Sequence, residues 1–162
     1  MTEFTHITGD RIHMVDVSAK DEIYREATAS GVIILRRDTI SVIADGTTIK
    51  GNVLATARVA ATLAIKDTSR IIPMCHGIPV HGIDIEFELT EETITARVRV
   101  ISTGKTGVEM EALTGVSVVL LTIWDMVKSA EKDENGKYPV TKIQEIKVEG
   151  KRKGAESPQR RD

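Results

Sequence analysis

The clearest hydrophobic pattern in the chain is a strict alternation of apolar and polar residues between positions 83 and 100. Apolar residues occupy every second position on both sides of a polar TEET segment: Ile83, Ile85, Phe87 and Leu89, then Ile94, Ala96, Val98 and Val100. A period of two predicts two strands, each with one buried face, joined as a hairpin. In the register that TEET favours, the polar faces carry opposite charges at facing positions: Glu86 with Arg97, and Asp84 with Arg99.

A long helix is predicted from about residue 109 to 130. Its middle, VSVVLLTIW, is apolar nearly all round, which predicts a buried helix. Glu109 and Glu111 fall in the first turn, where ordinary complementation of the helix dipole would explain them. Asp125 and Lys128 can meet on one helical face, either as a surface ion pair or as an acid–base pair with shifted pKa values. Glu111 and Asp125 are separated by roughly 21 Å at the rise of an α-helix, so one chain cannot easily bring both to the same atoms.

The remaining pattern is less regular. Ser18 is a possible cap for a helix starting near residue 19, and residues 32–37 and 39–45 are predicted strands because they are rich in β-branched residues. Asn52 is a plausible N-cap for an alanine-rich helix over 53–66. Residues 71–82 contain prolines and glycines typical of a loop, and 140–149 is the last predicted strand.

These elements predict one α+β domain over residues 1–149, with two or three helices on one face of an antiparallel sheet. Residues 150–162 lack periodicity and are predicted to be a mobile basic C-terminal tail. The net charge of −2 argues against a general nucleic-acid binder. A single cysteine, the lack of a signal-peptide pattern and the lack of a stretch of about 18 apolar residues favour a cytoplasmic protein that does not span a membrane.

Few chemical motifs are available. The chain has no dinucleotide or P-loop motif, and Cys75, His76 and His81 lack the paired spacing of a metal site. Lys50 precedes a predicted helix N-terminus, where an anion would bind, although a solvated lysine is an equally simple explanation. Taken alone, these residues are also compatible with a small nucleotide-binding or regulatory module that performs no chemistry.

Five segments, in order, resemble the cyclic pyranopterin monophosphate synthase family of molybdenum cofactor biosynthesis. They are DRIHMVDVSAK, KGNVLATAR, IPMCHGIP, TGKTGVEMEALTGVSVVLLTIWDM and the lysine that follows, and the resemblance covers about residues 5–147. It implies a ferredoxin-like α+β fold and a homohexamer built from three dimers, with active sites at the dimer interface. It also implies conversion of 3′,8-cyclo-7,8-dihydroguanosine 5′-triphosphate, made by a radical iron–sulfur enzyme, into cyclic pyranopterin monophosphate and pyrophosphate.

The resemblance implies site residues as well. Asp125 matches the catalytic aspartate, and Lys128 and Lys50 are expected to take part in catalysis. The expected substrate contacts are Met74, Cys75, His76, Glu109, Met110, Glu111, Lys20 and Arg25. A lysine–aspartate pair and a glutamate can supply the proton transfers of the rearrangement, while Lys20, Arg25 and Lys50 are candidates for a triphosphate clamp. No metal ligand set and no cofactor are expected. The chain departs from the family pattern at Gly77, where proline is usual, and at Trp124, where tyrosine is common.

Overall fold

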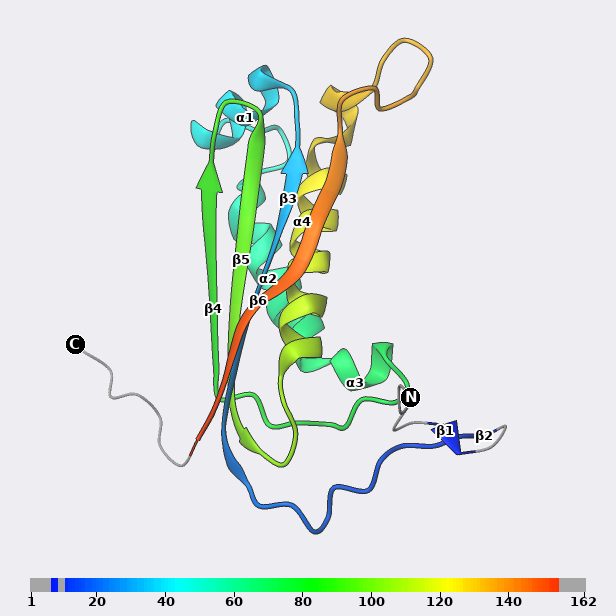
Figure 1. Ribbon diagram of the computed structural model, residues 1–162. Coiled ribbons are helices and arrows are strands. Elements are labelled where there is room, and N and C mark those ends of the chain that lie inside the picture. The colour runs from blue at the N-terminus through cyan, green and yellow to red at the C-terminus, as the bar shows by residue number, and fades with distance from the viewer. Residues whose placement is uncertain (1–6, 9–10, 155–162) are drawn as a thin grey trace, which may run out of the picture.

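Two layers, a sheet and a pair of long helices, make up the molecule (Figure 1). The structure is a computed structural model and describes residues 7–8 and 11–154. Its elements in chain order are β1 (Ile7–Thr8), β2 (Arg11–Ile12), β3 (Ile23–Ile34), α1 (Arg37–Ala44), α2 (Val53–Lys66), α3 (Thr68–Ile71), β4 (Gly82–Leu89), β5 (Thr93–Gly104), α4 (Glu109–Glu131) and β6 (Lys142–Gly154).

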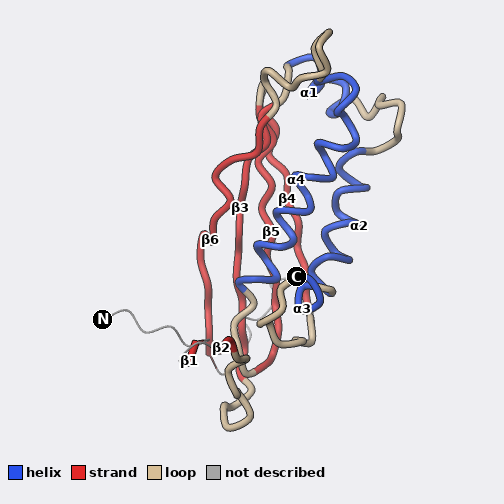
Figure 2. The backbone as a smooth tube through the Cα atoms, turned by 90° about the vertical axis from the view of Figure 1, so that its right-hand side faces the viewer, coloured by secondary structure: helices blue, strands red, loops and turns tan. Residues whose placement is uncertain are grey.

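The sheet has the ferredoxin-like topology. Its four long strands are antiparallel and lie in the order β4-β5-β3-β6, with α2 connecting β3 to β4 and α4 connecting β5 to β6. Figure 2 shows both long helices on the same face of the sheet. The α+β class with helices packed on one face, predicted from the sequence, is therefore confirmed.

Small residues let α4 lie close to the centre of the sheet. A Cβ atom added to Gly31 of β3 would come within 2.8 Å of side-chain carbons of both Val116 and Leu120. On the helix side, a Cβ atom at Gly115 would lie 2.8 Å from Ile65 of α2. Close packing removes one face of α4 from water: Val116, Val119, Leu120 and Ile123 have no solvent exposure, which stabilises the layer contact, whereas Leu121 on another face is 58% exposed.

Several predicted elements are confirmed in detail. The hairpin forms from β4 and β5, with Glu86 facing Arg97 and Asp84 facing Arg99. The Asn52 side chain accepts a hydrogen bond from the Ala55 backbone N–H at 2.9 Å, so it caps α2 as predicted. The long helix begins at Glu109, within the range that its pattern indicates.

Two predictions for the first third of the chain are wrong. No helix follows Ser18; residues 23–34 form β3, the strand between β5 and β6. Residues 39–45 are not a strand, since α1 spans Arg37–Ala44 and buries Thr39, Ile40 and Ile43 along one helical face. The short helix α3 at the start of the 71–82 loop was also not predicted.

The last strand is longer than predicted. β6 continues past Gly150 to Gly154, and its final residues pair with Tyr24 to Thr28 of β3. Its pairing with β3 is interrupted twice, near Ala29 and near Gly31, and Glu145 has a positive φ of 57°. The predicted mobile tail therefore begins with ordered strand residues, while 155–162 lie outside the described residues, as do 1–6 and 9–10.

Among the helices of the described residues, α4 is long and apolar enough to cross a membrane by length and composition, which the sequence analysis did not expect. In the fold, however, α4 packs against β3, β5 and α2. That burial is typical of the core helix of a two-layer domain.

Candidate active site

The site residues predicted from the sequence lie at opposite ends of α4. The helix is continuous from Glu109 to Glu131 and runs from the end of the molecule near α3 to the end near α1 (Figure 1). Its last turns carry Asp125 and Lys128, and its first turn carries the two predicted glutamates. The residues near the end of the helix form a C-terminal group, and those near its beginning form an N-terminal group.

The C-terminal group consists of Lys50, Asp125 and Lys128. The Lys128 ammonium donates a hydrogen bond of 2.6 Å to Asp125 Oδ1. Lys50 Nζ donates to the Asp125 backbone carbonyl at 2.9 Å and lies 4.0 Å from Asp125 Oδ2. Lys50 belongs to the α1–α2 loop, where the Thr48 hydroxyl donates to the Gly51 carbonyl and Gly51 takes a positive φ of 88°. One carboxylate is thus contacted by two cations from different elements.

Asp125 and Lys128 have shifted pKa values, although their side chains are exposed. The hydrogen bond from Lys128, followed by the charges of Lys128 and Lys50, lowers the pKa of Asp125. The same hydrogen bond raises the pKa of Lys128. Their side chains are nevertheless 62% and 46% exposed, because both residues lie on the face of α4 turned away from the sheet. In a single chain the two residues therefore form an exposed ion pair with shifted pKa values, which combines the two alternatives that the sequence left open.

A cavity of about 290 Å³ opens beside this group. It lies between α1, the α1–α2 loop and the end of α4, and its walls include Lys50, Ile49, Val42 and Met126. Ile49 is fully exposed. The C-terminal group therefore borders an open, largely apolar depression.

The N-terminal group surrounds a second cavity, of about 440 Å³. The 72–81 loop and the first turn of α4 meet there, as the sequence predicted, and the lining includes Lys20, Met74, Cys75, His76, Glu109, Met110 and Glu111. The His76 ring is held by a 2.8 Å hydrogen bond between Nε2 and the Val15 carbonyl. Three separate chain segments thus build one cavity.

Burial raises the pKa values of two side chains that line this cavity. Glu111 is only 3% exposed, and its desolvation, followed by the charge of Glu109, raises its pKa. Desolvation and the charge of Glu111 raise the pKa of the Cys75 thiol.

His81, the other histidine considered as a metal ligand, is held by the backbone: its Nδ1 accepts a hydrogen bond from the Thr103 N–H at 2.9 Å. Within the described residues, no group of three or more His, Cys, Asp or Glu side chains is placed to hold a metal ion.

A neighbouring cavity of about 390 Å³ is rich in cations. Lys20 and Glu109 line both this cavity and the 440 Å³ cavity. The walls of the 390 Å³ cavity also include Arg25, Lys105, Lys151 and Arg152. Burial alone would raise the pKa of Glu109, but the 2.8 Å hydrogen bond from Lys151 and the charges of Lys151 and Arg25 outweigh it and lower the pKa. Clustered lysine and arginine side chains are suited to phosphate groups.

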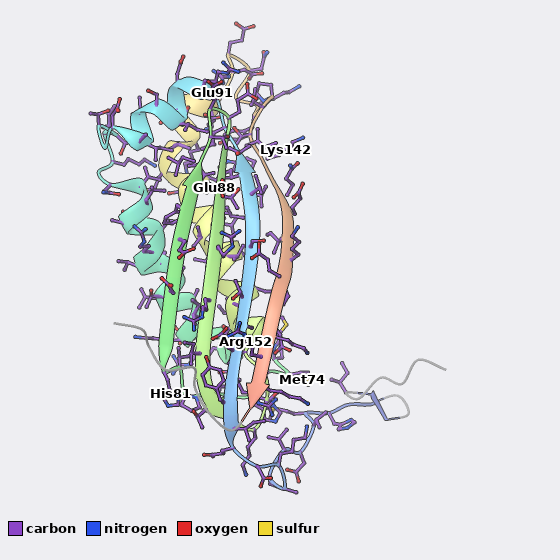
Figure 3. The ribbon with its side chains drawn as sticks, turned by 60° about the vertical axis from the view of Figure 1, so that its left-hand side comes forward. Met74, His81, Glu88, Glu91, Lys142 and Arg152 are labelled. Carbon is purple, nitrogen blue, oxygen red and sulfur yellow. The ribbon has the colours of Figure 1, made fainter. Side chains whose placement is uncertain are left out.

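Sequence reasoning missed Lys105, Lys151 and Arg152. Lys105 lies within a quoted motif, TGKTG, but nothing local indicates that its ammonium turns toward the cavity, where it donates to the Ser18 carbonyl at 2.6 Å. Lys151 and Arg152 belong to the segment assigned to the tail. The pairing of β6 with β3 carries them to the site, and Figure 3 shows Arg152 toward the same end of the sheet as Met74.

One predicted grouping fails within a single chain. Lys50 was expected beside Lys20 and Arg25 as part of a phosphate clamp, but it binds Asp125 near the opposite end of α4. Arg25 instead donates to the carbonyls of Gly104 and Lys105, both at 3.4 Å. The chain therefore has two candidate half-sites, one at each end of its longest helix: the C-terminal group and the N-terminal group.

The fold and these half-sites define a ferredoxin-like α+β protein with paired acid–base groups and a cationic, carboxylate-lined cavity. The chain belongs to the MoaC family, whose model matches residues 14–154. The resemblance found in its motifs is thereby confirmed.

Close relatives carry names that refer to one synthase, although not all of them are named as the synthase itself. A protein of Methanospirillum hungatei, 72% identical over 91% of this chain and 95% of its own length, is named a probable cyclic pyranopterin monophosphate synthase. One from Methanosphaerula palustris has the same name and is 64% identical over 95% of this chain and 100% of its own. A protein of Methanothermobacter thermautotrophicus, 58% identical over 94% of this chain and 96% of its own, is named a probable accessory protein of that synthase.

Proposed function

We propose that this protein catalyses the cyclic pyranopterin monophosphate synthase reaction of molybdenum cofactor biosynthesis. Its substrate would be 3′,8-cyclo-7,8-dihydroguanosine 5′-triphosphate, and its products cyclic pyranopterin monophosphate and pyrophosphate, which makes it a phosphorus–oxygen lyase. The observation that carries the proposal is the contact of Asp125 with both Lys50 and Lys128. An aspartate between two lysines can exchange protons with a bound substrate, which a binding module has no need to do.

The proton transfers are divided between groups whose pKa values are shifted in opposite directions. Asp125, whose pKa is lowered, stays ionised and accepts a proton in the C-terminal half-site, with Lys50 and Lys128 beside it. Glu111, with a raised pKa, can hold a proton and return it during the rearrangement. Environments that separate the pKa values of two carboxylates are a common way of assigning one as acid and the other as base.

The cationic cavity would hold the triphosphate. Lys20 and Arg25, with Lys105 and Lys151 beside them, are the proposed clamp. When a ribose hydroxyl attacks the α-phosphorus and closes the cyclic phosphate, negative charge develops on the departing pyrophosphate, and fixed cations stabilise it. Met74, Cys75, His76 and Met110 would contact the base-derived part of the substrate in the adjoining cavity.

The separation of the half-sites supports a shared active site. A catalytic group must come within about 3 Å of the proton it transfers, whereas Glu111 and Asp125 are roughly 21 Å apart along α4. We propose that each active site combines the N-terminal half-site of one subunit with the C-terminal half-site of another, in a homohexamer of three dimers. The exposure of Asp125 in the single chain is then the exposure of an interface residue. The protein would act in the cytoplasm, downstream of the radical enzyme that makes its substrate.

A direct assay tests the activity. The purified protein is supplied with the cyclised GTP derivative, and formation of the pterin and release of pyrophosphate are measured. Asp125→Ala should abolish both products. Arg70→Ala is the matched control. It also breaks an exposed ion pair between residues three apart in the chain, Arg70 with Asp67 at 3.4 Å, but Arg70 does not line the cavities of the candidate site. Wild-type protein that binds the substrate and returns it unchanged would refute the synthase activity and favour the binding-module alternative.

A further inference from the structure

A fully buried glutamate, Glu131, ends α4 and has no part in the chemistry proposed above. Its side chain has no solvent exposure. The carboxylate accepts hydrogen bonds from the Arg36 backbone N–H at 3.2 and 3.3 Å, from the Thr39 hydroxyl at 2.5 Å and from the Thr141 hydroxyl at 2.5 Å. All three neighbours donate, which matches a carboxylate because it only accepts.

This carboxylate acts as the cap of another helix. Arg36 is the N-cap residue of α1, and its own side chain makes no capping hydrogen bond. Glu131 instead accepts from the Arg36 backbone N–H, one of the free donors at this helix end, and its negative charge faces the positive end of the α1 dipole. Thr141, directly before β6, holds the second oxygen. One side chain therefore joins the end of α4 to the beginnings of α1 and β6.

Stability alone is a poor reason for a buried acid at this position. Removing a carboxylate from water is costly, and apolar side chains of similar volume often stabilise a fold equally well or better. What a fully satisfied polar network provides is a single arrangement of the elements that it joins. The question is then which group needs α1 to be held in one place.

The group that depends on α1 is Lys50. The α1–α2 loop, which carries Lys50, starts directly after α1, and two of the residues bound to Glu131, Arg36 and Thr39, line the same cavity as Lys50. Lys50 reaches Asp125 on the same helix that ends in Glu131. We infer that Glu131 is a positioning residue: it fixes α1 against α4 so that the Lys50 ammonium stays beside Asp125. This inference rests on the proposed function only for its effect on turnover.

Two substitutions of Glu131 separate positioning from general stability. Glu131→Ala removes every acceptor, and it should lower kcat about ten-fold or more while KM changes less than about two-fold, because the phosphate-binding groups lie at the other end of α4. Glu131→Gln should keep most of kcat, since either threonine hydroxyl can rotate to accept from the amide. Val98→Ala, at the centre of the sheet, is the control for loss of stability without loss of positioning. It should melt earlier than wild type and keep its kcat.

The outcomes are decisive in either direction. Equal kcat values for Glu131→Ala and Val98→Ala would overturn the inference, as would a Glu131→Gln variant as inactive as Glu131→Ala. If Glu131→Ala does not fold, Thr141→Val takes its place. It keeps the shape of the side chain, lies outside the Lys50 cavity and removes one hydrogen bond, so kcat should fall several-fold with KM unchanged; an unchanged kcat would overturn the inference.

A second measurement does not depend on turnover. Lysine amines labelled as ¹³C-dimethylamines give one NMR signal each, and Lys50→Arg assigns the Lys50 signal. In Glu131→Ala and Thr141→Val this signal should move toward that of a free lysine, whereas in Val98→Ala it should stay at the wild-type position. A Lys50 signal unchanged in the first two variants would refute the positioning role. Wild-type protein without turnover would instead refute the proposed function.

Discussion

Two inactive variants should regain activity when their subunits are mixed. Glu111→Gln damages the N-terminal half-site, and Asp125→Asn damages the C-terminal half-site. Each homogeneous variant has one lesion in every active site and should be inactive. If each site draws its two halves from different chains, a mixed dimer contains one site with both lesions and one site with neither. Activity then returns without any new contact.

The size of the effect follows from the geometry. Fourteen residues of continuous α-helix separate Glu111 from Asp125, and at a rise of about 1.5 Å per residue this is roughly 21 Å, far beyond the reach of one reacting centre. Random pairing of equal amounts gives half mixed dimers, and one of the two sites in each is intact. The refolded mixture should therefore recover about a quarter of the wild-type activity.

The assay is pterin formation after joint unfolding and refolding of the two variants, with mixed dimers verified by mass. A mixture of Asp125→Asn and Lys128→Ala is the matched control. Both lesions lie in the same half-site, so every site in a mixed dimer still contains one of them and no activity should return. A mixture of Glu111→Gln and Asp125→Asn that stays inactive, although mixed dimers are present, would refute the shared-site argument.

Three further predictions concern individual groups. Lys128→Ala should eliminate turnover without unfolding the subunit, because its ion pair with Asp125 lies outside the hydrophobic core of the chain; unfolding of the variant in a thermal melt would contradict this. Burial raises the pKa of Glu111, so its favourable contribution is complete below the ordinary glutamate pKa and is lost as pH rises through the raised value. Glu111→Gln should therefore gain stability relative to wild type between pH 4 and pH 8 in denaturant titrations, and a constant difference would argue against it. Lys20→Ala should weaken pyrophosphate binding about ten-fold in calorimetry, and unchanged affinity would remove Lys20 from the clamp.

The parts of the fold that were predicted correctly are those whose burial has a local period. The β4–β5 hairpin alternates at every second residue, and α4 is apolar nearly all round over the nine residues from Val116 to Trp124, so neither prediction depends on knowing what packs against the element. The α2 cap is also local, since Asn52 and Ala55 are three residues apart. Such elements leave a signature that one sequence is enough to reveal.

The wrong predictions have specific physical causes. Thr39, Ile40 and Ile43 are β-branched or buried apolar residues typical of strands, but their spacing of three and four is the helical signal that should have been given more weight. In β3 the close approach of α4 requires Ala27, Ala29 and Gly31, residues that local propensity does not assign to a strand. Tertiary packing, and not local propensity, therefore determines that this segment is a strand.

The site was predictable in identity more than in arrangement. Motifs indicated the residues of both half-sites, and the length of α4 indicated their separation. The contact between Lys50 and Asp125 joins positions 75 apart in the chain, and the contact between Lys151 and Glu109 joins positions 42 apart. Neither contact can be predicted from the residues near each position in the sequence. Glu131 was not noticed, because a glutamate at the end of a helix resembles any solvent-exposed charge until the threonines around it are seen.

The irregular pairing of β6 affects how the exposed edge of the sheet behaves in a single chain. β6 is an edge strand, and a long, flat edge would invite further strands and lead to aggregation. Two interruptions of its pairing and the positive φ of Glu145 make this edge irregular, and Lys147, Lys151 and Lys153 place charged side chains along it. A single chain is therefore less prone to strand-to-strand association along β6.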